Sequence, residues 1–341
     1  MPKNQNVLLF SGLVFLLIVV FLLNITFGQV AIPFKEVFQS LSGNVASKST
    51  WEYIIIHFRL PKAIVAILVG IGISVAGLMM QTLFKNSLAD PYILGLSSGS
   101  SFGVSILILG ASLLSNPLGY LIISTFGIIS ASCIGSFLVF SFVIIAAKKV
   151  KDTNTILIIG LIFSSFVASF VSILTNFSGA IELQKFAFWS LGNLGNLDWK
   201  SILILGLCIF VGLVLALQNI KSLDGLLLGE NYAKSMGQNV SKTRLSILFA
   251  TSLITGSITA FVGPIAFVGL AVPHLAKILF KTSKHLVLLA ATCLCGAILM
   301  LLCDTISQMP GFEFTLPINA VTSIIGAPII IILLLKKQTS N

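Results

Sequence analysis

The sequence predicts an all-α integral membrane protein with ten transmembrane helices. Of the 341 residues, 57% are hydrophobic and 9% are charged, and the mean hydropathy is +1.08. A soluble domain carries about 25% charged residues, because its surface must be solvated. The apolar runs are also continuous rather than alternating, which favours helices over the strands of a membrane barrel.

Each predicted span is an apolar run bounded by charged residues, proline or polar clusters. About 20 such residues cross a hydrocarbon core roughly 30 Å thick. The first run has no clear small-residue cleavage site, so it is expected to be retained, and Pro264 is expected to separate the seventh span from the eighth. Residues 1–341 are therefore expected to form one transmembrane domain. The spans are predicted at residues 7–27, 62–84, 92–114, 118–147, 154–175, 200–219, 243–262, 264–280, 286–307 and 317–335.

The distribution of basic residues predicts the orientation. With the N-terminus inside, fourteen of the twenty Lys and Arg residues fall in inner segments and six in outer segments. Cytoplasmic loops of membrane proteins carry an excess of Lys and Arg, so both termini are expected in the cytoplasm. The same excess of Lys and Arg in inner loops explains the net charge of +10, so the charge does not indicate a nucleic-acid partner.

Residue types that carry catalysis or bind metals are scattered. There is no G-x-x-x-x-G-K-[ST] loop to hold nucleotide phosphates, and His57, His274 and His285 form no cluster with metal-ligand spacing. Asp304, the acid closest to an apolar run, is expected at the outer end of its helix within reach of interfacial water, and a proton relay would need a second such group. The five cysteines lie in apolar runs and are interpreted as small hydrophobic residues. The pattern predicts transport by conformational change, with no catalytic residue, metal site or bound cofactor.

Three polar segments interrupt the apolar runs, at residues 28–61 and 176–199 on the outer side and 220–242 on the inner side. At the start of the third predicted span, Gly95, Gly99 and Gly103 recur at four-residue intervals, which predicts one closely packed helix face rather than substrate contact. In the inner segment 220–242, two glycines are predicted to bracket a short helix with Ala233 and Met236 on one face. From the residues alone, this helix is as compatible with a contact surface for a cytoplasmic partner as with a simple connector.

Four stretches resemble the motifs of the FecCD-type permeases, the membrane subunits of ABC importers for ferric siderophores, haem and cobalamin. They occur in the family's order and spacing and cover nearly the whole chain. They are "RLPKAIVAILVGIGISVAGLMMQTLFKNSLADPYILGLSSGSSFG" at 59–103, "GLLLGENYAKSMGQNV" at 225–240, "GPIAFVGLAVPHLAK" at 263–277 and "SIIGAPIIIILLLKK" at 323–337.

The resemblance implies a type II ABC importer permease fold in a bacterial inner cell membrane. It implies a homodimer, or a pair of similar subunits, that moves an iron-siderophore, haem or cobalamin-type chelate by alternating access. A separate cytoplasmic subunit would bind ATP and Mg²⁺, and a substrate-binding protein would dock outside. The alternatives are an ion-coupled secondary transporter, which should show paired intramembrane carboxylates, and an intramembrane enzyme, which should show clustered His, Asp or Glu residues.

The resemblance also implies roles for individual residues. Arg59 and Lys62 match the two cations of R-L-P-R, which meet acidic residues of the binding protein. The cytoplasmic gate corresponds to Asn86, Ser87, Leu88, Ala89, Asp90 and Pro91, and the segment that contacts the ATPase contains Gly229, Glu230, Ala233, Met236 and Gly237.

The chain departs from the family pattern at four positions. Ser87 replaces the proline of N-P-L-A, and Gln308 stands where the family usually has an arginine. Thr315 and Asn319 replace an acid and a glycine near the start of the last span. These changes bear on how the binding protein docks.

Overall fold

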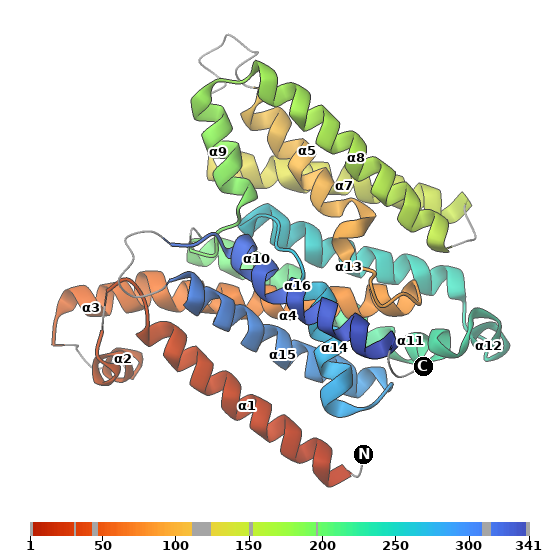
Figure 1. Cartoon of the computed structure of the whole chain (residues 1–341), viewed down its shortest axis with the longest axis horizontal. Helices are drawn as coiled ribbons and strands as arrows, with labels where there is room; N and C mark the ends of the chain where they lie inside the picture. Colours follow the sequence, from red (N-terminus) through yellow and green to blue (C-terminus); the bar gives the residue numbers. More distant parts are fainter. Residues whose placement is uncertain are drawn as a thin grey trace. The chain divides into compact units, whose positions relative to one another are not determined.

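A computed structural model describes residues 3–30, 32–42, 47–110, 124–149, 153–195, 197–308 and 315–338. Within these ranges every regular element is a helix, which confirms the all-α fold class (Figure 1). Parts of the third and fourth predicted spans, 111–114 and 118–123, lie outside the described residues.

Seven of the described helices are long and apolar enough to cross a membrane. Shorter apolar helices lie in α5 (Leu96–Ile108), α14 (Val268–Phe280) and α16 (Ile318–Gln338). The prediction of ten spans stays a prediction. The chain folds as two compact units. The first comprises Met1–Val75, Asn193–Leu207 and Ile265–Asn341, and the second comprises Ala76–Gly192 and Cys208–Pro264.

The first unit contains both chain termini. In it α15 contacts α1, α14 and α16, and Phe10 of α1 packs against Phe280 of α14 in a tilted arrangement with ring centroids 4.6 Å apart. Its elements are α1 (Lys3–Thr26), α2 (Phe34–Leu41), α3 (Ser49–Ile54), the π-helical turn η1 (Ile55–Arg59), the first part of α4 (Leu60–Leu83), the first part of α10 (Trp199–Gln218), α14 (Val268–Phe280), α15 (His285–Ser307) and α16 (Ile318–Gln338).

Two glycines allow a close helix contact in this unit. A Cβ at Gly70 of α4 would lie 2.6 Å from the carbonyl carbon of Gly296 of α15, closer than real Cβ atoms approach backbone. Backbones approach this closely in membranes where small residues face each other. Nothing in the spacing of the two glycines predicted this contact.

The second unit is built around α5, which packs on both α7 and α8, while α13 packs on α7 and α5. Its elements are the end of α4, the 3-10 helix η2 (Pro91–Leu94), α5 (Leu96–Ile108), α7 (Thr125–Lys149), α8 (Thr153–Phe177), α9 (Ala180–Ser190), the end of α10, α11 (Ile220–Leu228), α12 (Glu230–Ser235) and α13 (Val240–Val262).

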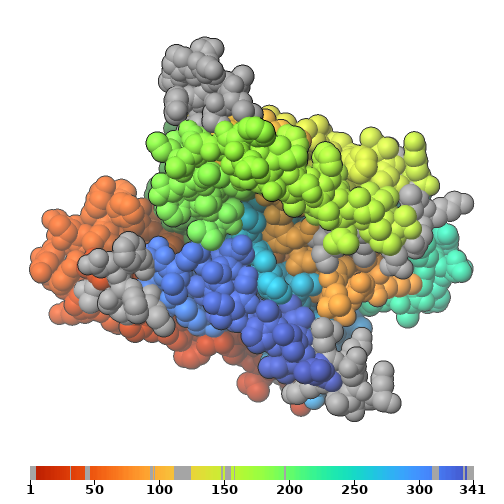
Figure 2. All heavy atoms as spheres, turned by 45° about the horizontal axis from the view of Figure 1, so that its top comes forward, coloured from red at the N-terminus to blue at the C-terminus, as the bar shows by residue number. Residues whose placement is uncertain are grey.

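One side of α8 is an exposed apolar surface, green in Figure 2. Leu161, Ile162 and Phe166 are each more than half exposed, and so are Ile173 and Phe177. A patch of this kind on a soluble chain would mark an interface. On a membrane-spanning chain it is the surface expected to face lipid.

Candidate functional site

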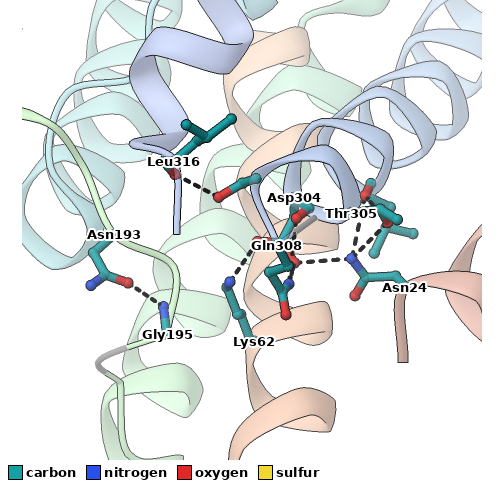
Figure 3. A network of polar contacts seen from close by, with 10 residues as sticks. Asn24, Lys62, Asn193, Gly195, Asp304, Thr305, Gln308 and Leu316 are labelled. Carbon is teal, nitrogen blue, oxygen red and sulfur yellow. Dashed lines mark hydrogen bonds and ion pairs between the residues drawn. The ribbon is translucent and has the colours of Figure 1, made fainter. Parts of the chain in front are cut away.

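A buried polar network centres on Asp304 near the end of α15 (Figure 3). Lys62 Nζ lies 3.0 Å from Asp304 Oδ1. Asn24 and Gln308 donate their amide N–H groups to Asp304 Oδ2 at 2.9 and 2.6 Å. Asp304 is 1% exposed, and a carboxylate so far from water is tolerated only when it is paired and hydrogen-bonded.

The same network joins three helices of the first unit. Asn24 of α1 also donates to Leu301 O and Thr305 Oγ1 of α15, at 3.3 and 3.0 Å, while Lys62 belongs to α4. Interfacial water was expected to solvate Asp304. The structure instead buries it and supplies protein partners, one of which is Gln308 at the position where the family pattern has arginine.

Arg59 is also buried, at 7% exposure. Its guanidinium donates to the carbonyls of Ile25 and Thr26, both at 2.7 Å, and to that of Val30. The last carbonyls of a helix have no intrahelical donor, so Arg59 caps the end of α1. A Cβ at Gly28 would lie 2.8 Å from a guanidinium nitrogen, so glycine leaves room for this cap. The docking role of Arg59 and Lys62 stays a prediction.

The predicted gate segment is a short loop between α4 and η2. Asn86 Oδ1 accepts from Leu88 N at 2.9 Å, and Asp90 Oδ1 accepts from Tyr92 N at 2.9 Å, which caps η2. Ala89 and Asp90 are buried, while Leu88 is exposed. Burial raises the pKa of Asp90 to about 6, and the hydrogen bond from Tyr92 opposes that shift. Asn86 and Asp90 therefore each accept a backbone N–H two residues ahead, as side chains in tight turns do.

The glycines that follow the loop pack against two different helices. A Cβ at Gly99 would lie 2.7 Å from Gly135 O of α7, and one at Gly103 would meet Ala131 O of the same helix. Gly95 is not in α5. It has φ of 78° and ends η2, and a Cβ there would lie 3.2 Å from Gly160 O of α8.

The prediction of one helix face is therefore wrong for Gly95. The physical reason lies just before it. Pro91 and the Asp90 cap start a 3-10 turn that ends at Gly95, and the positive φ of Gly95 changes the direction of the chain before α5 begins at Leu96.

The predicted ATPase-contact segment contains α12 between two glycines with positive φ, Gly229 (126°) and Gly237 (78°). Gln238 N donates to Ala233 O and Gly237 N to Lys234 O, the pattern that ends a helix on glycine. The helix therefore stops at Ser235.

The expectation that Ala233 and Met236 share a face of this helix is wrong. Ala233 is fully buried, whereas Met236 lies beyond the last helical residue and is 61% exposed. Glu230 Oε1 lies 3.1 Å from a guanidinium nitrogen of Arg244 in α13, a contact that the sequence did not indicate.

Within the described parts of the chain, no three His, Cys, Asp or Glu side chains come together as a metal site. Sequence reasoning missed the roles of Asn24 and Arg244. An asparagine inside the first apolar run was a usable signal, because an unpaired amide is costly in hydrocarbon. Its partner on α15, 280 residues away, was not predictable from spacing.

Comparison with known proteins agrees with this architecture. Residues 16–336 match the FecCD transport family. The hemin transport system permease HmuU of Yersinia pestis is 30% identical, with 98% of each chain covered, and the vitamin B12 import system permease BtuC of Vibrio cholerae is 31% identical, with 88% of each covered. A structure described as an inward-facing conformation of an ABC transporter of the metal-chelate type aligns with a TM-score of 0.83 and 26% identity, covering 96% of this chain and 99% of that one. The chain belongs to the FecCD transport family and is a membrane-spanning permease subunit of an ABC importer.

Proposed function

We propose that this permease moves a metal chelate of the iron-siderophore, haem or cobalamin type across the inner membrane of a bacterial cell, with both termini in the cytoplasm. The support is the similarity over nearly the full chain to a hemin permease, a vitamin B12 permease and a transporter of the metal-chelate type. The cycle is alternating access, in which the pathway opens in turn to each side of the membrane.

A separate ATPase subunit supplies the energy. ATP and Mg²⁺ bind that partner, and the permease carries out no covalent chemistry and holds no cofactor. The segment with Gly229, Glu230, Ala233, Met236 and Gly237 contacts the ATPase. The exposed side chain of Met236 and the helix α12 beside it are compatible with a projecting contact surface. A second copy of the chain completes the pathway as a homodimer.

A substrate-binding protein docks on the outer side near Arg59 and Lys62. Both side chains already bind groups within the permease. Their charges would therefore attract an acidic binding protein through the electrostatic potential at the docking surface. Reversing Lys62 alone would break its buried pair with Asp304, so the exchanged pair K62E/D304K, which keeps an ion pair at this site, is used instead. It should weaken association with the binding protein in a salt-dependent way. The exposed Lys48, away from the R-L-P-K motif, offers K48E as a surface control. Equal association of K62E/D304K and the unaltered chain would contradict the docking role.

The experiment that tests the function uses cells that depend on this importer for one chelate. Uptake of haem, cobalamin and a ferric siderophore is measured with and without the gene of the candidate partner ATPase. We expect uptake of one class of chelate to stop when the ATPase is deleted and to return when it is restored. Uptake that persists with no ATPase able to substitute would instead favour an ion-coupled transporter.

A further inference from the structure

The helix α12 is tied to α13 by an ion pair. Glu230, the first residue of α12, lies with Oε1 3.1 Å from a guanidinium nitrogen of Arg244, in the second turn of α13. The Arg244 side chain is 10% exposed and that of Glu230 is 37% exposed. The pair therefore connects a mostly buried cation on a membrane-spanning helix with a partly exposed acid on the short helix.

Other contacts hold the surrounding segments to each other. Asn219 Nδ2 donates to Ser246 Oγ at 2.8 Å and joins the end of α10 to α13. Gln238 Nε2 donates to Lys221 O at 3.1 Å and joins the turn after α12 to α11. A Cβ at Gly225 would lie 2.7 Å from Gln238 Oε1, so glycine admits this side chain. These contacts join α13 to the end of α10, and the turn after α12 to α11.

Besides α12, the helix α13 contacts α7 and also η2, the 3-10 turn at the end of the gate segment. Phe249 of α13 contacts Phe140 of α7 with ring centroids 5.8 Å apart. A Cβ at Gly256 would lie 3.4 Å from Ser136 Cβ of α7. The same helix also contacts η2, whose start is capped by Asp90. One rigid helix therefore contacts both the short helix α12 and the 3-10 turn that follows residues 86–91.

We propose that Arg244 and Glu230 are positioning residues whose ion pair transmits displacement of α12 to α13, and through α13 to η2 and the gate segment. This inference rests on the proposed function, since α12 moves only if an ATPase partner displaces it. Without the pair, α12 is held less firmly to α13, so part of its displacement is taken up in residues 236–239 and less chelate moves for each ATP hydrolysed. The coupling between the two sites is then weakened although both sites remain.

The test uses the complete complex in proteoliposomes, with haem, cobalamin and a ferric siderophore as probes. Two quantities are measured, the rate of ATP hydrolysis and the amount of chelate transported per ATP. We expect R244Q to retain hydrolysis and to lose at least about fivefold in chelate per ATP, the lower end of typical coupling between sites. E230Q should lose a similar factor in chelate per ATP, whatever its rate of hydrolysis. R244K keeps the cation and should retain most of the transport. K242Q removes an exposed cation two residues away and should match the unaltered complex.

Transport per ATP at the unaltered level in R244Q overturns the proposal. A loss in E230Q alone also overturns it, because Glu230 would then act on the ATPase and not on Arg244. If R244Q does not assemble with the ATPase, the exchanged pair E230R/R244E is measured instead. If E230R/R244E transports much more chelate per ATP than E230Q does, the proposal is supported. If it transports as little chelate per ATP as E230Q does, the proposal is overturned. Failure of the proposed function looks different, since the unaltered complex would then show no ATP-driven uptake.

Discussion

Removing either partner of the Lys62–Asp304 ion pair is expected to destabilise the permease, and by different amounts. K62M leaves the Asp304 carboxylate, 1% exposed, with only the amides of Asn24 and Gln308 as donors. Breaking a buried ion pair by removing one partner typically costs about 3–5 kcal/mol. D304N leaves a lysine whose side chain is 16% exposed and better able to reach water, so its cost is smaller, about 1.5–3 kcal/mol.

The double variant K62M/D304N removes both charges, and a buried pair replaced as a whole is often neutral. We therefore expect the double variant to be more stable than K62M alone. Thermal unfolding in detergent, followed by tryptophan fluorescence, measures this. At about 2 °C per kcal/mol, Tm of K62M should fall by about 6–10 °C. Single-variant costs that add to within about 0.5 kcal/mol in the double variant would show that the two side chains do not interact and would refute the reasoning.

The remaining predictions concern helix packing and the gate segment. G103L places a side chain against Ala131 O and Gly135 Cα, and overpacking of this kind costs about 1–3 kcal/mol. A Cβ at Gly12 would meet nothing within 4 Å, so G12L is the matched control and should keep the unaltered Tm. D90N should remove a pH dependence: because the pKa of Asp90 is raised from 3.8 to about 6, its contribution to stability is present below pH 3.8 and is lost as pH rises through 6. The shift corresponds to about 3 kcal/mol, so Tm of the unaltered chain should fall from pH 4 to pH 7 more than that of D90N. Parallel pH profiles of the two proteins would contradict this.

The fold class followed from composition because a chain with 9% charged residues cannot solvate its surface. The end of α13 at Val262 was predicted, because Gly263 and Pro264 interrupt the apolar run there. The start of α5 at Leu96 was not predicted, since the αL conformation at Gly95 follows the 3-10 turn before it. Spacing predicted that Gly99 and Gly103 share a helix face, but it did not identify α7 as the helix that they contact.

The polar contacts were less predictable than the helices. A cation at position 59 was expected to face outward, whereas the free carbonyls at the end of α1 bind it inside the chain. Gln308 was noted only as a departure from the family pattern, and its hydrogen bond to Asp304 gives the departure a structural role. Asn319, a second departure, accepts from Ala266 N at 3.1 Å. The contacts of Arg59 and Asn319 join segments more than 30 residues apart, and spacing does not predict them. Gln308 and Asp304 are four residues apart, a spacing at which helical side chains are neighbours, so this contact was open to prediction. Nothing in the structure explains Thr315.

The proposal that ATP hydrolysis drives import is tested most directly by chelate uptake into proteoliposomes that contain the permease and its ATPase, with the binding protein added on the outer-facing side. We expect uptake that requires hydrolysable ATP and stops when the ATPase is inactivated by mutation. It should persist when ionophores collapse the proton and sodium gradients. Uptake by the permease alone, driven by an ion gradient and independent of ATP, would contradict the proposal.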